Sequence, residues 1–100
     1  MTLTHDHNKA FMFKPPENLT IYHAVALKEQ IASCFEQGDN VALDLSGVSE
    51  IDTAGLQLLI LAKQHATRMN KSFQLLACSS VVDETLTFCN LQTFFIEGAG

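Results

Sequence analysis

Three carboxylates and a threonine lie close together in the middle of this chain of 100 residues. Asp44 lies in an apolar run, Glu50 and Asp52 follow after a short polar segment, and Thr53 comes next. Carboxylates that gather at the end of a strand can bind Mg²⁺ or accept a phosphoryl group, and a hydroxyl can accept a phosphate. The chain, however, lacks paired acidic residues after its first predicted strand and a lysine at the end of the strand predicted for residues 73–77. We therefore rank a small enzyme or receiver-like site built on these carboxylates as the weakest interpretation.

Asp52 and Gly55 also have a purely structural interpretation. An Asp immediately before a helix accepts hydrogen bonds from the free amides of the first turn and interacts favourably with the helix dipole. Asp52 is therefore predicted to cap a helix that begins at Thr53, which leaves Thr53 exposed at the helix start. Gly55 would let the same turn pack close to the sheet. Whether this segment does more than cap a helix depends on the surface beside it.

The helix predicted for residues 53–69 has two apolar stripes. At about 100° per residue one arc faces the core, and its members are Leu58, Leu59, Ala62, Ala66 and Met69. Leu56 and Ile60 lie on another stripe, among the polar residues Gln57, Lys63 and Gln64, which predicts a contact patch for a partner. The alternative is that a broad sheet buries a wider arc of this helix. The candidate partner-binding residues are Asp52, Thr53, Ala54, Gly55, Leu56, Gln57 and Ile60.

The elements that must position this segment alternate between strands and helices. Strands are predicted for residues 10–14, 19–21, 41–45, 73–77 and 94–96, and helices for residues 23–36, 53–69 and 80–89. The apolar residues of the first helix recur with helical spacing, at Ala24, Leu27, Ile31, Cys34 and Phe35. Gly38 is expected to end that helix in the left-handed conformation, and Ser79 or Ser80 is expected to cap the third helix. This order predicts an α/β fold with parallel, right-handed crossovers and helices packed against the sheet.

The composition restricts the class of protein. A content of 47% hydrophobic and 17% charged residues is typical of one compact domain, which we place at residues 10–97 between flexible tails at residues 1–9 and 98–100. Six basic residues against eleven acidic ones give a net charge of −5, which argues against a nucleic-acid partner. No segment resembles an export signal or a membrane span, so we expect a cytoplasmic protein without direct membrane insertion.

Sequence signatures of catalysis, cofactors and metals are missing. The chain has no glycine-rich nucleotide or dinucleotide loop and no G-x-S-x-G. Cys34, Cys78 and Cys89 have neither a C-x-x-C nor a zinc-finger spacing and are expected to be buried, reduced thiols. His23 and His65 fall on predicted helices, where a surface or interface position is expected. We predict a protein that is not an enzyme and that uses no cofactor and no metal.

The segment V-A-L-D-L-S-G-V-S-E-I-D-T-A-G-L-Q-L-L, residues 41–59, resembles the signature of STAS domains, which occur in bacterial anti-sigma factor antagonists. The later segment S-S-V-V-D-E-T-L-x-x-C-x-L resembles the third helix of that family. In element order the resemblance extends over residues 10–96. It implies the STAS fold, a mixed four- to five-stranded sheet with helices packed on one side. It also implies a non-catalytic, protein-binding module of a partner-switching or signalling system.

The same resemblance points to a switch. Family antagonists are controlled by phosphorylation of a hydroxyl residue two positions after the Asp; here that position is Ala54, which leaves Thr53 as the candidate switch residue. Similar D-T-A-G-L segments occur in chemotaxis-linked STAS proteins and in STAS subunits of lipid-transport ABC systems. The implied partner is an anti-sigma factor or serine-kinase-like protein, a chemotaxis component or, as the alternative function, the ATPase of a lipid-transport ABC complex. Homodimerisation through Leu56 and Ile60 is a further alternative.

Overall fold

Three parallel strands form the main sheet, in the order β1-β3-β5. They span Phe11–Phe13, Asn40–Asp44 and Ser72–Leu76 in the computed structural model, which describes residues 11–97. The central strand β3 carries Val41, Ala42 and Leu43, each at most 1% exposed. This nearly continuous apolar run is typical of a buried central strand in a parallel sheet.

A second, smaller sheet pairs two short strands, β2 (Asn18–Leu19) and β4 (Glu50–Ile51), which are also parallel. The prediction of a mixed sheet is therefore wrong for the described residues, because every pairing among them is parallel. Pro15 and Pro16 separate β1 from β2, and the missing amide donors of proline prevent a continuous ladder there. The chain instead carries β2 to the edge of the molecule where β4 enters α2.

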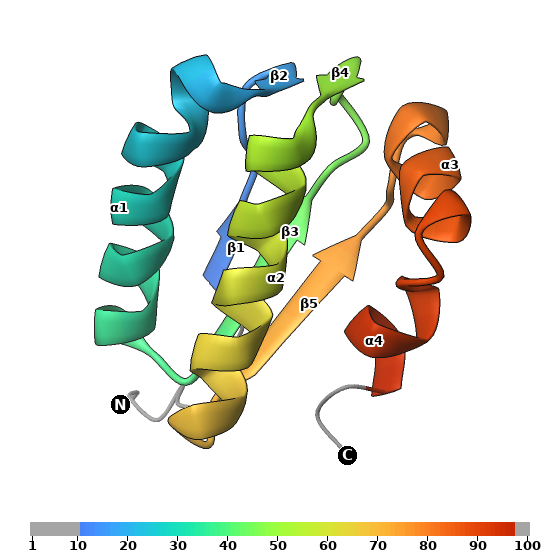
Figure 1. Cartoon of the computed structure of the whole chain (residues 1–100). Coiled ribbons are helices and arrows are strands. Elements are labelled where there is room, and N and C mark those ends of the chain that lie inside the picture. The colour runs from blue at the N-terminus through green and yellow to red at the C-terminus, as the bar shows by residue number, and fades with distance from the viewer. Residues whose placement is uncertain (1–10, 98–100) are drawn as a thin grey trace.

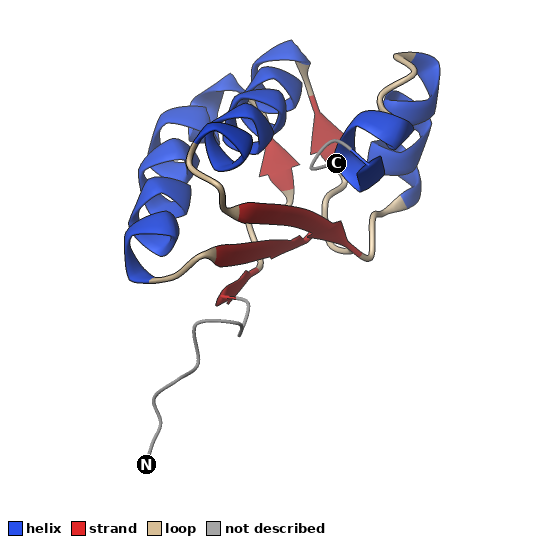
Figure 2. Ribbon diagram, turned by 90° about the horizontal axis from the view of Figure 1, so that it is seen from below, coloured by secondary structure: helices blue, strands red, loops and turns tan. Residues whose placement is uncertain are grey.

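Four helices cover the sheet: α1 (Ile21–Gln37), α2 (Thr53–Arg68), α3 (Ser80–Phe88) and α4 (Gln92–Glu97). Figure 1 shows α1 and α2 side by side, with α3 and α4 beyond β5, and Figure 2 shows all four helices on the same side of the three-stranded sheet. The predicted α/β class, with helices packed on one side, is confirmed. Parallel strands connected through helices require this layered arrangement.

One apolar core lies between the helices and the sheet. It combines Leu27, Ile31 and Phe35 of α1, Val41 and Leu43 of β3, Leu58, Leu59, Ala62 and Ala66 of α2, Phe73 of β5, and Val82 and Leu86 of α3. The prediction for the core arc of α2 is confirmed except at Met69, which is 53% exposed. Met69 follows the last helical residue, and the chain turns away at Asn70 with a φ of 59°.

Several predicted boundaries need correction. Ile21 begins α1 instead of ending a strand, and Gly38 is extended, with a φ of −166°, so it is not left-handed. Residues 94–96 lie in α4, not in a strand. Phe95 of this helix is buried in the core and packs edge-on against Phe94 at 5.0 Å between ring centroids. Ser79 caps α3 as predicted, accepting from the Val82 amide at 3.3 Å. The predicted flexible tails lie outside the described residues.

Candidate functional site

The carboxylate of Asp52 joins the first turns of two helices. Its Oδ1 accepts a hydrogen bond from the amide of Gly55 at 3.0 Å, which caps α2 as predicted. Its Oδ2 accepts from the amide of Ile21, the first residue of α1, at 3.1 Å. The local cap residue of α1, Thr20, makes no side-chain cap hydrogen bond, so Asp52 supplies this acceptor from across the structure. One side chain therefore fixes the starts of α1 and α2 relative to each other.

These hydrogen bonds also set the charge of Asp52. The Gly55 amide lowers the pKa of Asp52 most, desolvation opposes it with a smaller effect, and the Ile21 amide adds a further decrease, so that the pKa lies below its ordinary value of 3.8. The carboxylate is consequently ionised at neutral pH, with two helix N-termini directed toward it.

Gly55 lies where the start of α2 comes closest to β2. A Cβ atom at this position would be 2.0 Å from the carbonyl oxygen of Leu19 and 2.8 Å from its carbonyl carbon. The amide of Asp52 donates to the same carbonyl oxygen at 3.1 Å. The turn is thus held against β2 by a backbone hydrogen bond that only a glycine at position 55 permits, in agreement with the expected role of Gly55 in close packing.

Thr53 is exposed at the start of α2, directly after the capping Asp52. Its hydroxyl makes no hydrogen bond within the part of the chain that the structure describes. Ala54, at the position where family antagonists carry the hydroxyl, is half-buried. A fixed turn therefore presents one free hydroxyl to solvent.

Leu56 and Ile60 are half-buried and pack against the core, whereas Gln57 is exposed. Lys63, counted among the polar neighbours of this stripe, is only 4% exposed, and its ammonium donates to the carbonyl of Phe73 at 3.4 Å. Burial lowers the pKa of Lys63. Leu56 and Ile60 thus offer a narrower apolar surface than their sequence pattern indicates. Their part in partner binding stays a prediction.

The first turns of α1 carry a larger exposed apolar surface. Ile21 is 64% exposed, Tyr22 90% and Val25 70%, and we refer to these three residues as the α1 patch. The hydrogen bond from the Ile21 amide to Asp52 places the patch next to the turn that holds Thr53. The sequence pattern does not predict this patch, because it places Ile21 at the end of a strand. The available signal was that Ile21, Tyr22 and Val25 are apolar yet fall outside the core stripe of the helix.

The carboxylates of Asp44, Glu50 and Asp52 do not come together in one site. Within residues 11–97, no three His, Cys, Asp or Glu side chains are grouped so that they could hold a metal ion, so Asp44, Glu50 and Asp52 do not form such a cluster. The carboxylate of Asp44 accepts hydrogen bonds from Ser46, two residues along the chain, and these bonds lower the pKa of Asp44.

The cysteines differ in their exposure. Burial raises the pKa of the half-buried thiols of Cys34 and Cys78. Cys89 is exposed, which corrects the prediction of three buried thiols.

None of the helices in the described part of the chain combines the length and hydropathy that a membrane span requires.

Comparison with known proteins agrees with this geometry. A family model described as Mlab, STAS domain, matches residues 16–97, and no curated protein gives a significant match. Among solved structures, a crystal structure of a candidate anti-sigma factor antagonist from Thermotoga maritima matches with a TM-score of 0.72 and 21% sequence identity. The match covers 87% of this chain and 84% of that one. The resemblance to STAS domains is thereby confirmed, and at this identity the solved structure supports the fold alone.

Proposed function

The chain belongs to the STAS domain family, and from this premise we propose that it is a non-catalytic, protein-binding module of a bacterial partner-switching or signalling system. In this proposal it acts in the cytoplasm, in the manner of an anti-sigma factor antagonist. Its partner is a kinase-like anti-sigma factor or a chemotaxis component. The observation that carries the proposal is the free, exposed hydroxyl of Thr53 on a turn fixed by Asp52 and Gly55.

The surface next to Thr53 supports a protein partner. The α1 patch exposes three large apolar side chains on neighbouring turns of one helix, and exposed apolar patches of this kind mark interaction sites. Because Asp52 bonds to both helices, the patch and Thr53 keep a fixed mutual position. A partner could therefore contact both at once, with the tyrosine ring of Tyr22 as an anchor.

Phosphorylation of Thr53 is the proposed switch. A phosphate would add a charge of about −1.5 to −2 at a helix N-terminus, where the dipole favours it, but next to the ionised Asp52, which opposes it. The added charge and its hydration would disfavour docking of an apolar partner surface. The module would thus bind its partner when Thr53 is unmodified and release it when Thr53 carries the phosphate.

A second candidate function is that of a regulatory STAS subunit that binds the ATPase of a lipid-transport ABC complex. The alanine at position 54 favours it, because this residue removes the hydroxyl that family antagonists use for phosphorylation. In that case Thr53 and the α1 patch would form a constitutive contact rather than a switched one. The two candidates share a binding surface and differ in the partner.

A pull-down from native bacterial lysate tests the proposal. Wild-type protein is compared with Thr53→Glu, which puts a negative charge at the switch position, and with Gln64→Glu, which puts the same charge on an exposed position of α2 about three turns away. We expect Thr53→Glu to lose a protein that both the wild type and Gln64→Glu retain.

The identity of the retained protein separates the two candidates. A kinase-like anti-sigma factor or a chemotaxis component would support the switching module, and an ABC ATPase would support the second candidate. If all three baits retain the same proteins, Thr53 does not belong to the binding surface and the proposal is wrong.

A further inference from the structure

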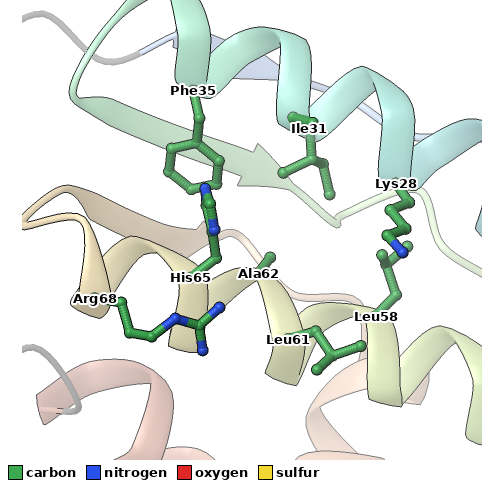
Figure 3. A pocket seen from close by; sticks show the side chains of 9 residues that line it. Lys28, Ile31, Phe35, Leu58, Leu61, Ala62, His65 and Arg68 are labelled. Carbon is green, nitrogen blue, oxygen red and sulfur yellow. The ribbon is translucent and has the colours of Figure 1, made fainter.

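A groove of about 340 Å³ runs along the outer side of the helix pair α1 and α2 (Figure 3). We call it the α1–α2 groove; its lining residues are Lys28, Ile31, Ala32, Phe35, Leu58, Leu61, Ala62, His65 and Arg68. Its floor is apolar and belongs to the core, as Ile31, Phe35 and Leu58 are each at most 6% exposed. The rim adds Leu61, which is 52% exposed although it is a large aliphatic residue.

Two cations border this apolar floor without partners. The ammonium of Lys28 and the guanidinium of Arg68 make no ion pair and no side-chain hydrogen bond with any described residue. The other described cations are engaged elsewhere: Lys63 and Lys71 donate to backbone carbonyls, and Lys14 interacts with Asp44. Among the described residues, both unpaired cations thus line this apolar groove, whose described lining includes no Asp or Glu, in a protein with a net charge of −5. Arg68 also lines the adjoining hollow with Gln64, Thr67 and Phe94, so it lies at the margin of the groove.

The residues that line the groove follow the direction of the two helices. On α1 the stripe Ile21, Val25, Lys28, Ala32 continues the α1 patch toward the floor, and on α2 the stripe Leu58, Leu61, His65, Arg68 runs parallel to it. These spacings of three and four residues keep each stripe on one face of its helix. The His65 ring packs edge-on against Phe35, with 5.4 Å between centroids, and joins the two stripes at the lower end. The lining of the groove therefore follows both helices, from Lys28 to Phe35 on α1 and from Leu58 to Arg68 on α2.

We propose that the α1–α2 groove docks an amphipathic helix of a partner protein, with aliphatic side chains on its contact face and Asp or Glu along the margins of that face. Apolar anchors would cover Leu58, Leu61 and Ala62, as in other helix-in-groove complexes. Carboxylates on the margins would face Lys28 and Arg68. These charge pairs would determine which helices bind and in which orientation, and would add less to the affinity. The inference rests on the proposed function in taking the ligand to be a protein, and it extends the contact surface from Thr53 along the whole helix pair.

Fluorescence anisotropy with a labelled model peptide tests the inference. The peptide has about 16 residues, the length of α2, with Leu at the contact positions and Glu on the margins; a matched peptide carries Lys in place of Glu. We expect the wild-type protein to bind the Glu peptide in preference to the Lys peptide. Arg68→Glu should weaken binding of the Glu peptide roughly 10-fold and improve binding of the Lys peptide.

Lys14→Glu is the matched control, because it makes the same charge change at an exposed residue that does not line the groove. It should alter binding of the Glu peptide by less than about twofold, with circular dichroism confirming that both variants are folded. The inference is overturned if the wild type binds neither peptide, or if Lys14→Glu and Arg68→Glu weaken binding equally.

Two further outcomes would assign the groove to another occupant and overturn the inference. One is a wild-type dimer in sedimentation that Arg68→Glu dissociates, which indicates a second copy of this chain. The other is binding of dodecanoate without binding of either peptide, which indicates a small amphiphile. Failure of this inference can be distinguished from failure of the proposed function. If the wild type binds neither peptide, but Thr53→Glu loses the native partner, the proposed function is supported and only the groove interaction is wrong.

Discussion

Gly55, in the first turn of α2, has no room for a side chain. The added methyl group of Gly55→Ala would meet the backbone carbonyl of Leu19 at 2.0 Å, so the backbone itself must move. We expect the free energy of unfolding to fall by about 3 kcal/mol in urea denaturation, with β2 shifted from the start of α2. Gly47→Ala is the control: its Cβ would lie 3.3 Å from the flexible end of Lys14, and a change within about 0.5 kcal/mol is expected. Equal losses in the two variants would contradict the close-packing role.

Asp52 acts on two helices, and its removal is expected to lower stability more than removal of a carboxylate whose hydrogen bonds are local. Asp52→Ala leaves the amides of Gly55 and Ile21 without their acceptor. Asp44→Ala removes the acceptor of hydrogen bonds from Ser46, two residues away, and an attraction to Lys14, but it frees no helix N-terminus. The urea midpoint should therefore fall further for Asp52→Ala than for Asp44→Ala. Equal midpoints would mean that the bond between Asp52 and α1 contributes nothing to stability.

The pH dependence of stability gives an independent measure of Asp52. Its pKa is lowered in the folded protein, so the unfolded chain binds the proton more tightly and stability falls as the pH falls. The contribution of Asp52 is complete above its ordinary pKa of 3.8 and disappears as the pH drops through the lower folded value. The difference in unfolding free energy between wild type and Asp52→Asn should therefore shrink below about pH 4. A difference that is constant from pH 3 to 6 would contradict this account.

At the residue scale the sequence predicts those features that are determined by residues nearby in the chain. Asp52 as the cap of α2, the exposure of Thr53 and the close approach at Gly55 follow from local rules, and the structure has all three. The bond from the Ile21 amide to Asp52 spans 31 residues and has no local signature. It requires β2 and β4 to pair, and these two-residue strands are too short for a periodicity to reveal them.

At the scale of elements, α2 contains a buried lysine, whereas the sequence pattern predicts an exposed polar position there. Lys63 is 4% exposed and reaches the carbonyl of Phe73 in β5, with no carboxylate partner among the described residues. Burying a charge without a counter-ion opposes folding, and burial accordingly lowers the pKa of Lys63. The side chain thus links α2 to β5 at a cost in stability.

Replacing Lys63 with an apolar residue of similar length should remove that cost. We expect Lys63→Met to raise the free energy of unfolding at pH 7 by about 1 kcal/mol, whereas Lys14→Met, at an exposed position, changes it little. The advantage should diminish as the pH rises from the lowered folded pKa toward the ordinary value of 10.5, because the wild-type lysine then loses its proton in the folded state first. Denaturation series at pH 7 and pH 10 measure both effects. A destabilised Lys63→Met would show that the bond to Phe73 outweighs desolvation.

The C-terminal element shows where local pattern fails. Phe94, Phe95 and Ile96 favour a strand by residue type, yet they lie in α4. Asn90, with a φ of 57°, turns the chain after α3, and the Leu91 amide donates to the Leu86 carbonyl. The chain is thereby directed back toward β5, against which the short helix α4 packs and buries Phe95. Tertiary packing therefore overrides the strand preference of these residues.

At the scale of the whole molecule, the exposed aromatic residues lie on opposite sides. Tyr22 is 90% exposed on α1, and Phe88 is 89% exposed on α3. Figure 1 places these helices at the two flanks of the molecule, with α2 between them. The proposed binding surface, built from Thr53, the α1 patch and the α1–α2 groove, lies on the α1 flank. Substitutions of these two aromatic residues can therefore be compared to determine which flank binds the partner.

The partner retained by the wild type in the pull-down is the ligand for this comparison. Tyr22→Ser should weaken its binding roughly 10-fold, because a large aromatic side chain at a protein interface commonly contributes at that level. Phe88→Ser should leave the affinity unchanged, and both variants should keep the wild-type urea midpoint because the side chains are almost fully exposed. Titration calorimetry with the purified partner measures the affinities. If Phe88→Ser weakens binding and Tyr22→Ser does not, the partner docks on the α3 flank, which contacts β4 just before Thr53, and the α1 patch does not belong to the interface.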